Sequence, residues 1–240
     1  MIYGAMKFSI GGPLKLAFRP WVEGLENIPA EGPAILASNH LSFSDSFFLP
    51  MVLRRRITFV AKAEYFDDPK TAWFFRAVGQ IPIKRTGGTD AKGALEAATD
   101  VLRDGGLFGI YPEGTRSPDG RLYKGHTGVA RLAIENRVPV LAVAMIGTRE
   151  AQPIGQLRPR VFMPITIRIS APMHFTPAGD HGPGPLALRR VTDEIMFELA
   201  RLSGQEYVDR YAKQRDPEAI DLAEPTPVLT GPPLRSTAVA

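Results

Sequence analysis

From Ala34 onward the sequence alternates short, continuously apolar runs with longer amphipathic stretches, and this alternation constrains the fold more than any other feature. The runs are rich in β-branched residues and do not alternate polar with apolar positions, which is typical of strands buried on both faces. Strands that alternate with helices predict an α/β fold, with a mixed, largely parallel central sheet flanked by helices. The predicted strands are Ala34–Ser38, Ile57–Ala61, Gln80–Ile83, Leu107–Tyr111, Val140–Ile146 and Ile165–Ser170.

Two longer stretches carry apolar residues at helical spacing. Leu186–Leu202 has an apolar residue at every third or fourth position, which predicts an amphipathic helix with one buried face. Ala91–Arg103 has the same pattern, and we predict Asp90 as its N-cap and Gly105 as its stop signal. These two helices would cover faces of the sheet.

The two ends of the chain differ in composition from the part between them. Residues 1–21 hold eight large apolar side chains, three cations and no acid, which predicts an N-terminal arm at a membrane interface. The break at Gly11–Pro13 prevents one long amphipathic helix, so an arm packed on the core is the alternative. Residues 216–240 contain five prolines and no aromatic residue, which predicts a disordered tail. Residues 22–215 would then form one domain.

Composition narrows the classes of partner and of chemistry. Residues 1–215 carry 28 basic and 21 acidic residues, so this part needs an anionic partner: a nucleic acid, a phosphorylated small molecule or an anionic membrane. Its cations cluster beside glycines at strand ends, which argues against nucleic acid. The absence of cysteine excludes a cysteine nucleophile and thiolate zinc sites, and we predict no metal site. The sequence has no run of 18 or more apolar residues, so we predict no membrane-spanning helix.

The first polar cluster follows the predicted strand Ala34–Ser38. His40 comes directly after this strand, where ligands bind in open α/β sheets. We predict a helix over Asp45–Leu53 that Ser42 caps, so that Asp45 can fold back onto one imidazole nitrogen. The other nitrogen would be free to take a proton as a general base. The alternative is that Asp45 only favours the helix dipole and that His40 is structural.

A second polar cluster follows the predicted strand Leu107–Tyr111. An arginine beside hydroxyl groups and a glycine is suited to a phosphate, because the guanidinium donates as a fork and glycine exposes backbone N–H groups. A carboxyl group there could accept a hydrogen bond from a substrate hydroxyl. A simple turn is the alternative, because Ser117–Gly120 is rich in turn-forming residues. The candidate binding residues are Glu113, Gly114, Thr115 and Arg116.

A third cluster begins where the predicted strand Gln80–Ile83 ends. Lys84 and Arg85 stand there, before a Gly-Gly turn, and two cations beside a flexible turn also suit a phosphate. A solvated basic strand end is the alternative interpretation.

Together these clusters resemble the four ordered sequence blocks of the glycerolipid acyltransferases, and among them the bacterial 1-acylglycerol-3-phosphate acyltransferases of the PlsC type. The similarity covers the chain from Val22 to Thr148 and includes the spacing between blocks. Tyr111 stands where the family usually has Phe, and no full transmembrane anchor, present in many relatives, is predicted. The blocks are Asn39-His40 with Asp45, Gly79–Arg85, Tyr111–Ser117 and Val138–Val140.

The resemblance implies a glycerolipid acyltransferase fold and transfer of an acyl group from a thioester to a glycerol hydroxyl. His40 would be the base and Asp45 its orienting partner, and backbone N–H groups or Lys84 would stabilise the oxyanion. The thiol leaves readily, so neither a covalent acyl-enzyme nor a cofactor is required. The resemblance assigns the acceptor phosphate to Arg85 and Arg116, and the lining of the acceptor site to Glu113 and Gly114.

We therefore expect a peripheral enzyme at the cytoplasmic face of the membrane that converts lysophosphatidic acid and an acyl thioester into phosphatidic acid. Its partners would be a lysophospholipid, acyl-CoA or acyl-ACP, an anionic membrane surface and, if it is the donor, acyl carrier protein. Another lysolipid or aminolipid acceptor, a non-catalytic lipid-binding protein and a hydrolase are the alternatives. The presence of both Arg85 and Arg116 favours a phosphomonoester acceptor, and the His40–Asp45 pair argues against a non-catalytic protein.

Overall fold

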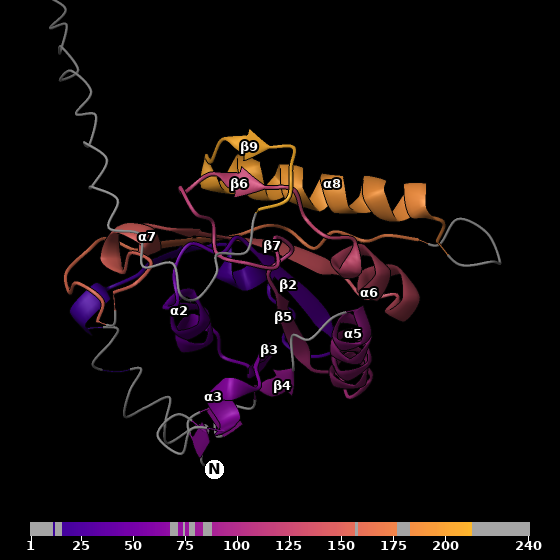
Figure 1. The fold of residues 1–240 in the computed structure, drawn as a ribbon, viewed down its shortest axis with the longest axis horizontal. Helices are drawn as coiled ribbons and strands as arrows, with labels where there is room; N and C mark the ends of the chain where they lie inside the picture. Colours follow the sequence, from indigo (N-terminus) through magenta and orange to yellow (C-terminus); the bar gives the residue numbers. More distant parts are fainter. Residues whose placement is uncertain are drawn as a thin grey trace, which may run out of the picture.

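Strands and helices alternate along the chain in the computed structural model (Figure 1). The structure describes residues 12, 16–67, 72, 73, 75, 76, 80–83, 88–156, 158–176 and 183–212. The predicted tail and most of the predicted arm lie outside these residues, as do Lys84 and Arg85. The elements are β1 (Trp21–Glu23), η1 (Leu25–Asn27), β2 (Ala34–Ser38), α2 (Asp45–Val52), β3 (Ile57–Lys62), α3 (Glu64–Asp67), β4 (Ile81–Ile83), α5 (Gly88–Arg103), β5 (Leu107–Ile110), β6 (Leu122–Tyr123), α6 (Gly128–Asn136), β7 (Val140–Ile146), α7 (Thr148–Ala151), β8 (Thr166–Ile169), α8 (Pro185–Ser203) and β9 (Tyr207–Val208).

A seven-stranded sheet in the order β1-β8-β7-β2-β5-β3-β4 forms the centre of the fold. The strands from β7 to β4 are parallel to one another, β8 is antiparallel to β7, and β1 is parallel to β8. The predicted α/β class with a mixed, largely parallel sheet is therefore confirmed. β6 and β9 pair with each other in a separate two-stranded sheet.

The connections that leave the neighbouring strands β2 and β5 run in opposite directions across the sheet. From β2 the chain passes through α2 to β3 and β4 on one side, and from β5 it passes through α6 to β7 on the other side of β2. Where neighbouring strands connect in opposite directions, a crevice forms beyond their carboxyl ends, and open α/β sheets bind ligands there. His40 stands at this position.

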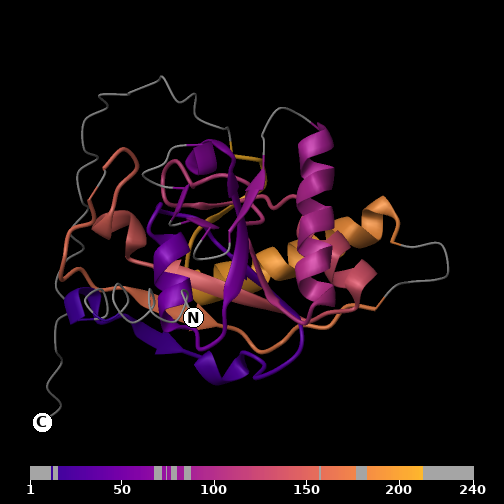
Figure 2. The same cartoon turned by 90° about the horizontal axis from the view of Figure 1, so that it is seen from below.

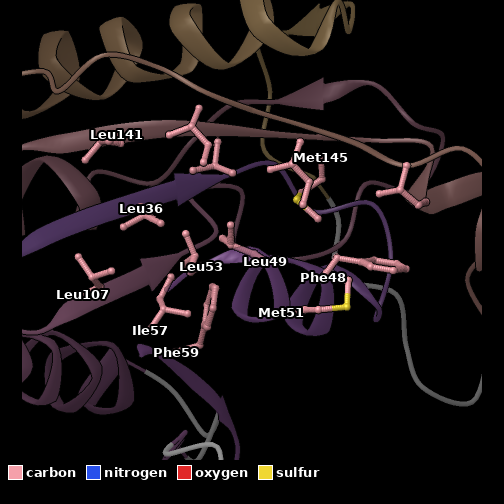
Figure 3. Close-up of a cluster of buried hydrophobic side chains, with 14 of the residues drawn as sticks. Leu36, Phe48, Leu49, Met51, Leu53, Ile57, Phe59, Leu107, Leu141 and Met145 are labelled. Carbon is pink, nitrogen blue, oxygen red and sulfur yellow. The ribbon is translucent and has the colours of Figure 1, made fainter. Parts of the chain in front are cut away.

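The residues of β2 are all buried, and they divide between the two faces of the sheet. Ile35 and Ala37 belong to a cluster with α5, α6 and α8, whereas Ala34 and Leu36 pack with α2. Figure 3 shows the second cluster, in which Phe48, Leu49 and Met51 of α2 lie against the sheet. Burial on both faces explains why these strands are continuously apolar in sequence.

Most predicted elements are present with shifts of one to three residues, and two details are wrong. Asp90 lies inside α5, which begins at Gly88, so it is not the N-cap. The N-cap of α2 is Ser44, and the Ser42 hydroxyl instead accepts a hydrogen bond from the Ser44 N–H at 3.2 Å. The short strands β1, β6 and β9 and the helices α3 and α7 had no predicted counterpart, because two to four residues carry no periodic signal.

The segments that precede β1 and β8 lie side by side in Figures 1 and 2, at the same end of the sheet as His40. The register explains this position, because Thr166 at the start of β8 pairs with Ile146 at the end of β7. The Phe162 N–H donates to the Ala17 carbonyl at 3.0 Å and joins the two segments. No helix among the described residues is long and apolar enough to cross a membrane.

Candidate active site

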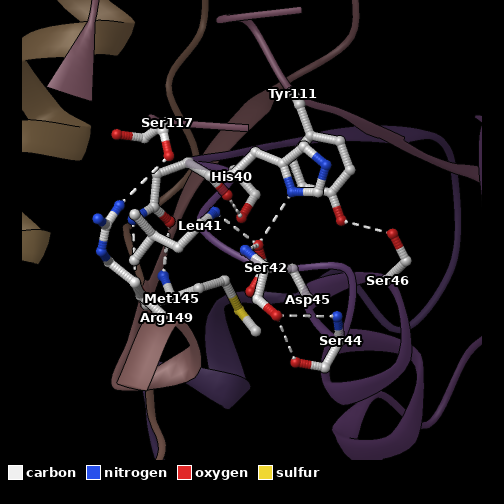
Figure 4. A network of polar contacts seen from close by, with 12 residues as sticks. His40, Leu41, Ser42, Ser44, Asp45, Ser46, Tyr111, Ser117, Met145 and Arg149 are labelled. Atoms are coloured by element: carbon white, nitrogen blue, oxygen red, sulfur yellow. Dashed lines mark hydrogen bonds and ion pairs between the residues drawn. The ribbon is translucent and has the colours of Figure 1, made fainter. Parts of the chain in front are cut away.

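The predicted contact between His40 and Asp45 is present. Nδ1 of His40 lies 2.9 Å from Oδ2 of Asp45, and the same oxygen accepts hydrogen bonds from the N–H groups of Leu41 at 2.7 Å and Ser42 at 2.8 Å (Figure 4). The Asp45 side chain is fully buried, whereas that of His40 is 16% exposed. An ionised carboxylate only accepts hydrogen bonds, so Nδ1 carries a proton and Nε2 is left as the basic nitrogen.

The imidazole plane is fixed by stacking on Tyr111. The two ring centroids lie 3.9 Å apart with planes inclined by 12°, and the Tyr111 hydroxyl lies 3.0 Å from the Ser46 hydroxyl. Burial and the charge of Asp45 raise the pKa of the Tyr111 phenol above its ordinary value. The neutral ring therefore supports the imidazole without competing for its proton. The expected phenylalanine would provide the same stacking, which explains how Tyr111 fits this position.

Glu113 braces the His40 loop from within the protein. It is 1% exposed, and its carboxyl accepts hydrogen bonds from the N–H groups of His40 at 3.2 Å and Tyr123 at 2.9 Å. Burial, with a smaller effect from the charge of Asp45, raises the pKa of Glu113 to about 7 against those two hydrogen bonds. Both oxygens of Glu113 accept hydrogen bonds from backbone groups. Contact between Glu113 and a substrate stays a prediction.

The residues after Glu113 form the outer part of the loop that follows β5. Gly114 is exposed with φ at 72°, and its N–H donates to the Tyr111 carbonyl at 2.9 Å, so this N–H is not the free donor that the sequence suggested. Thr115 and Arg116 are half-buried. Among the described residues no carboxylate pairs with Arg116, so its guanidinium is available for an anion. Lys84 and Arg85 lie outside the described residues, and their roles stay predictions.

Two amide side chains complete the site, the buried Asn39 and the half-buried Gln205, and only the first belongs to a sequence block. Asn39 is fully buried; its oxygen accepts from the Met145 N–H at 2.7 Å, and its Nδ2 donates to the Met145 carbonyl at 3.0 Å. The same Nδ2 donates to Oε1 of Gln205 at 2.6 Å. Gln205 lies 166 positions along the chain from Asn39, and no pattern in the sequence marks it.

Comparison with known proteins identifies the class to which this site belongs. A family model described as Acyltransferase matches residues 19–146, which include the His40, Asp45 and Glu113–Arg116 positions. The chain belongs to the acyltransferase family. The matched acyltransferase region runs from the segment before β1 to the end of β7, so it contains the sheet edge described above but neither α8 nor Gln205.

Relatives with named activities are similar to this acyltransferase over part of their length. A chloroplastic 1-acyl-sn-glycerol-3-phosphate acyltransferase of Arabidopsis thaliana is 34% identical over 135 residues, 56% of this chain and 38% of that protein. The 1-acyl-sn-glycerol-3-phosphate acyltransferase of Pseudomonas aeruginosa is 35% identical over 124 residues, 51% of this chain and 48% of that protein. The chain thus spans less than half the length of these two relatives.

A solved structure is similar over a larger part of both chains. It is the crystal structure of the 1-acyl-sn-glycerophosphate acyltransferase PlsC from Thermotoga maritima. The TM-score is 0.61 at 26% sequence identity, and the match covers 85% of this chain and 79% of that one. The acyltransferase fold therefore extends beyond the matched family region.

Proposed function

We propose that this acyltransferase transfers a fatty acyl group from an acyl thioester to the free hydroxyl of 1-acylglycerol-3-phosphate and forms phosphatidic acid. The observation that carries the proposal is the His40–Asp45 contact of 2.9 Å at the sheet edge where open α/β sheets bind ligands. The named activities of the Arabidopsis, Pseudomonas and Thermotoga proteins agree with it. CoA and acyl carrier protein both remain candidate carriers of the donor.

The proposed reaction needs one base that later acts as an acid. Nε2 of His40 accepts the proton of the glycerol hydroxyl as the hydroxyl oxygen attacks the thioester carbonyl carbon. The tetrahedral oxyanion then collapses, the carbon–sulfur bond breaks, and the protonated imidazole returns its proton to the thiolate. Asp45 holds Nδ1–H and stabilises the imidazolium that forms between the two steps.

A product assay tests the proposed acceptor. We expect the protein to convert a labelled acyl thioester and lysophosphatidic acid into labelled phosphatidic acid, and to act much more slowly on neutral lysolipids and aminolipids. The products are separated by thin-layer chromatography. Equal transfer to a neutral lysolipid would contradict the phosphomonoester acceptor, and free fatty acid formed without any acceptor would indicate a hydrolase.

Arg116 provides the next prediction. If its guanidinium, which pairs with no described carboxylate, holds the acceptor phosphate, Arg116→Ala should raise the KM for lysophosphatidic acid by about 10- to 100-fold, because a charge-assisted fork contributes about 1.5–3 kcal/mol. The KM for the acyl donor should change little. Arg131→Ala, which removes an exposed cation paired with Glu135 on α6, is the matched control. An equal rise in both KM values would show that Arg116 is structural.

We also propose that the protein attaches peripherally to anionic membrane through the segments before β1 and β8. Four large apolar side chains in these segments and at the start of β1 are exposed: Leu16 by 67%, Trp21 by 67%, Val161 by 54% and Phe162 by 80%. Phe162 also holds a φ of 62°, which a bulky side chain rarely adopts. Phe18 instead packs against Phe48 with ring centroids 5.0 Å apart, so the described end of the arm is partly core.

The charge around these apolar side chains suits an anionic surface. Arg19, Arg158 and Arg160 lie in the same two segments, and none of them forms an ion pair with a described residue. Apolar side chains that enter the acyl boundary and arginines that meet lipid phosphates act together in interfacial binding. Because both segments lie at the His40 end of the sheet, attachment there would present the site to a lysolipid in the bilayer.

Vesicle binding tests this attachment. The combined variant Leu16→Ser, Trp21→Ser and Phe162→Ser should bind anionic vesicles at least about 1,000-fold more weakly, because each of the three apolar side chains contributes on the order of 1.5–3 kcal/mol when buried. Turnover of a short-chain soluble acceptor should be preserved. Leu186→Ser is the matched control, since Leu186 is 87% exposed at the start of α8. Unchanged sedimentation of the triple variant with vesicles would refute this surface.

A further inference from the structure

Gln205 lies between two loops of the candidate site. It follows Gly204, the C-cap of α8, whose φ of 70° turns the chain back toward the sheet. The Gln205 oxygen accepts a hydrogen bond from Nδ2 of Asn39 at 2.6 Å, and its own Nε2 donates to the Gly120 carbonyl at 2.7 Å. One amide side chain therefore bridges residues from two separate loops.

The first loop carries the base. Asn39 immediately precedes His40, and among the described residues its buried amide is hydrogen-bonded to Gln205 and to the backbone of Met145 in β7. Both hydrogens of Nδ2 are thus used, one by Met145 and one by Gln205. Without Gln205, one donor of a fully buried amide would lose its partner, which is costly in a protein interior.

The second loop carries Arg116. It continues through Ser117, whose N–H donates to the His40 carbonyl at 2.7 Å and whose hydroxyl accepts from the Gly120 N–H at 2.9 Å. Gln205 reaches the same loop at Gly120. The base loop and the Arg116 loop are therefore joined directly through Ser117 and Glu113, and again through the bridge made by Gln205.

The segment after Gln205 supports the Arg116 loop at two more points. In Figure 1, β9 lies beside β6 above the main sheet, and Tyr123 of β6 donates its N–H to Glu113. Farther along, the Tyr211 ring stacks on His126 with centroids 4.5 Å apart. The His126 ring in turn lies so close to Gly114 that a Cβ there would be 3.2 Å from it. β9 and Tyr211 thus brace the outer side of the loop.

We propose that Gln205 is a positioning residue for acyl transfer, which holds the base loop and the Arg116 loop at a fixed separation. The assignment rests on the proposed function, because it takes His40 as the base and Arg116 as the phosphate ligand. Transfer requires the acceptor hydroxyl to lie within hydrogen-bond reach of Nε2 while Arg116 holds the phosphate of the same acceptor molecule. A change in the separation of the loops therefore affects both kcat and the KM for the acceptor.

Two substitutions of Gln205 separate positioning from packing. Gln205→Met fills a similar volume without polar atoms, and we expect kcat/KM for lysophosphatidic acid to fall about 10-fold or more, because small misplacements of reacting groups are costly. Gln205→Glu still accepts from Asn39 but cannot donate to the Gly120 carbonyl. Its kcat/KM should therefore lie between that of wild type and that of Gln205→Met. Glu206→Gln is the matched control, since this neighbouring side chain is exposed and pairs with Arg121 at 3.5 Å rather than with Asn39 or Gly120.

A second readout does not depend on the identity of the acceptor. The imidazole signals of His40, assigned in ¹H–¹⁵N spectra with a His40→Gln variant, should shift or broaden in Gln205→Met and remain unchanged in Glu206→Gln. Even if wild-type protein failed to acylate lysophosphatidic acid, this spectrum would still decide the positioning claim. Wild-type imidazole signals and wild-type kcat in a folded Gln205→Met would overturn the proposal. Should that variant fail to fold, the same two wild-type results in Gln205→Glu would overturn it.

Discussion

His40→Ala should lower the rate of acyl transfer by about 10³- to 10⁴-fold, at the upper end of what a positioned general base contributes. The reason is the geometry of the ring: Nδ1 is held by Asp45 at 2.9 Å, one face stacks on Tyr111 at 3.9 Å, and Nε2 remains as the basic nitrogen. No other described side chain replaces it, because Glu113 is buried and bonded to backbone groups. The measurement is single-turnover transfer of a labelled acyl group.

The fold should survive this substitution. The His40 side chain is partly exposed, and the backbone of the loop is held by Ser117 and Glu113 rather than by the imidazole. His174→Ala, which changes an exposed histidine beyond β8, is the matched control and should transfer at the wild-type rate. Substantial transfer by a well-folded His40→Ala protein would contradict the assignment of the base.

Asp45→Asn should lower transfer by about 10²- to 10³-fold, a large loss but smaller than that from removal of the base. The amide oxygen can still accept from the N–H groups of Leu41 and Ser42, so the start of α2 is retained. What is lost is the negative charge beside Nδ1, which stabilises the imidazolium formed during the reaction. The rate is measured by the same single-turnover assay.

The control for Asp45→Asn is another change of acid to amide. Asp100→Asn alters an exposed carboxylate on α5, away from the imidazole, and should leave the rate unchanged. A wild-type rate in Asp45→Asn would mean that Asp45 serves only the hydrogen bonds to Leu41 and Ser42. Circular dichroism and melting temperature confirm that both variants are folded.

The central sheet was predictable because its strands are buried on both faces. Leu36 and Ile35 of β2 pack into different clusters, and this burial leaves a continuous apolar run that sequence analysis finds to the residue. The pair β6–β9 was not predictable in the same way. Each strand has two residues, and the two strands that pair lie more than 80 positions apart in the sequence. Pairing over that distance leaves no local pattern.

In the candidate site, too, contacts between residues close in sequence were predictable and contacts between distant residues were not. The contact of His40 with Asp45 is local, since five positions and one helix start bring them together, and sequence spacing predicts it. The inward orientation of Glu113 and the bridge through Gln205 depend on partners brought together by the folded sheet. Sequence alone therefore predicts the contact between the proposed base and its orienting partner but not the contacts that set their position relative to Arg116.

The pH dependence of transfer tests the role of His40 most directly. A base must be deprotonated to act, so kcat/KM of the wild-type protein should fall about tenfold per pH unit on the acid side of one ionisation. Glu113, whose pKa burial raises to about 7, is a second ionisable group beside His40, so the comparison with His40→Ala is decisive. The account predicts that the residual rate of His40→Ala lacks this acid limb. An acid limb of the same slope and midpoint in His40→Ala would contradict it and place the essential ionisation elsewhere.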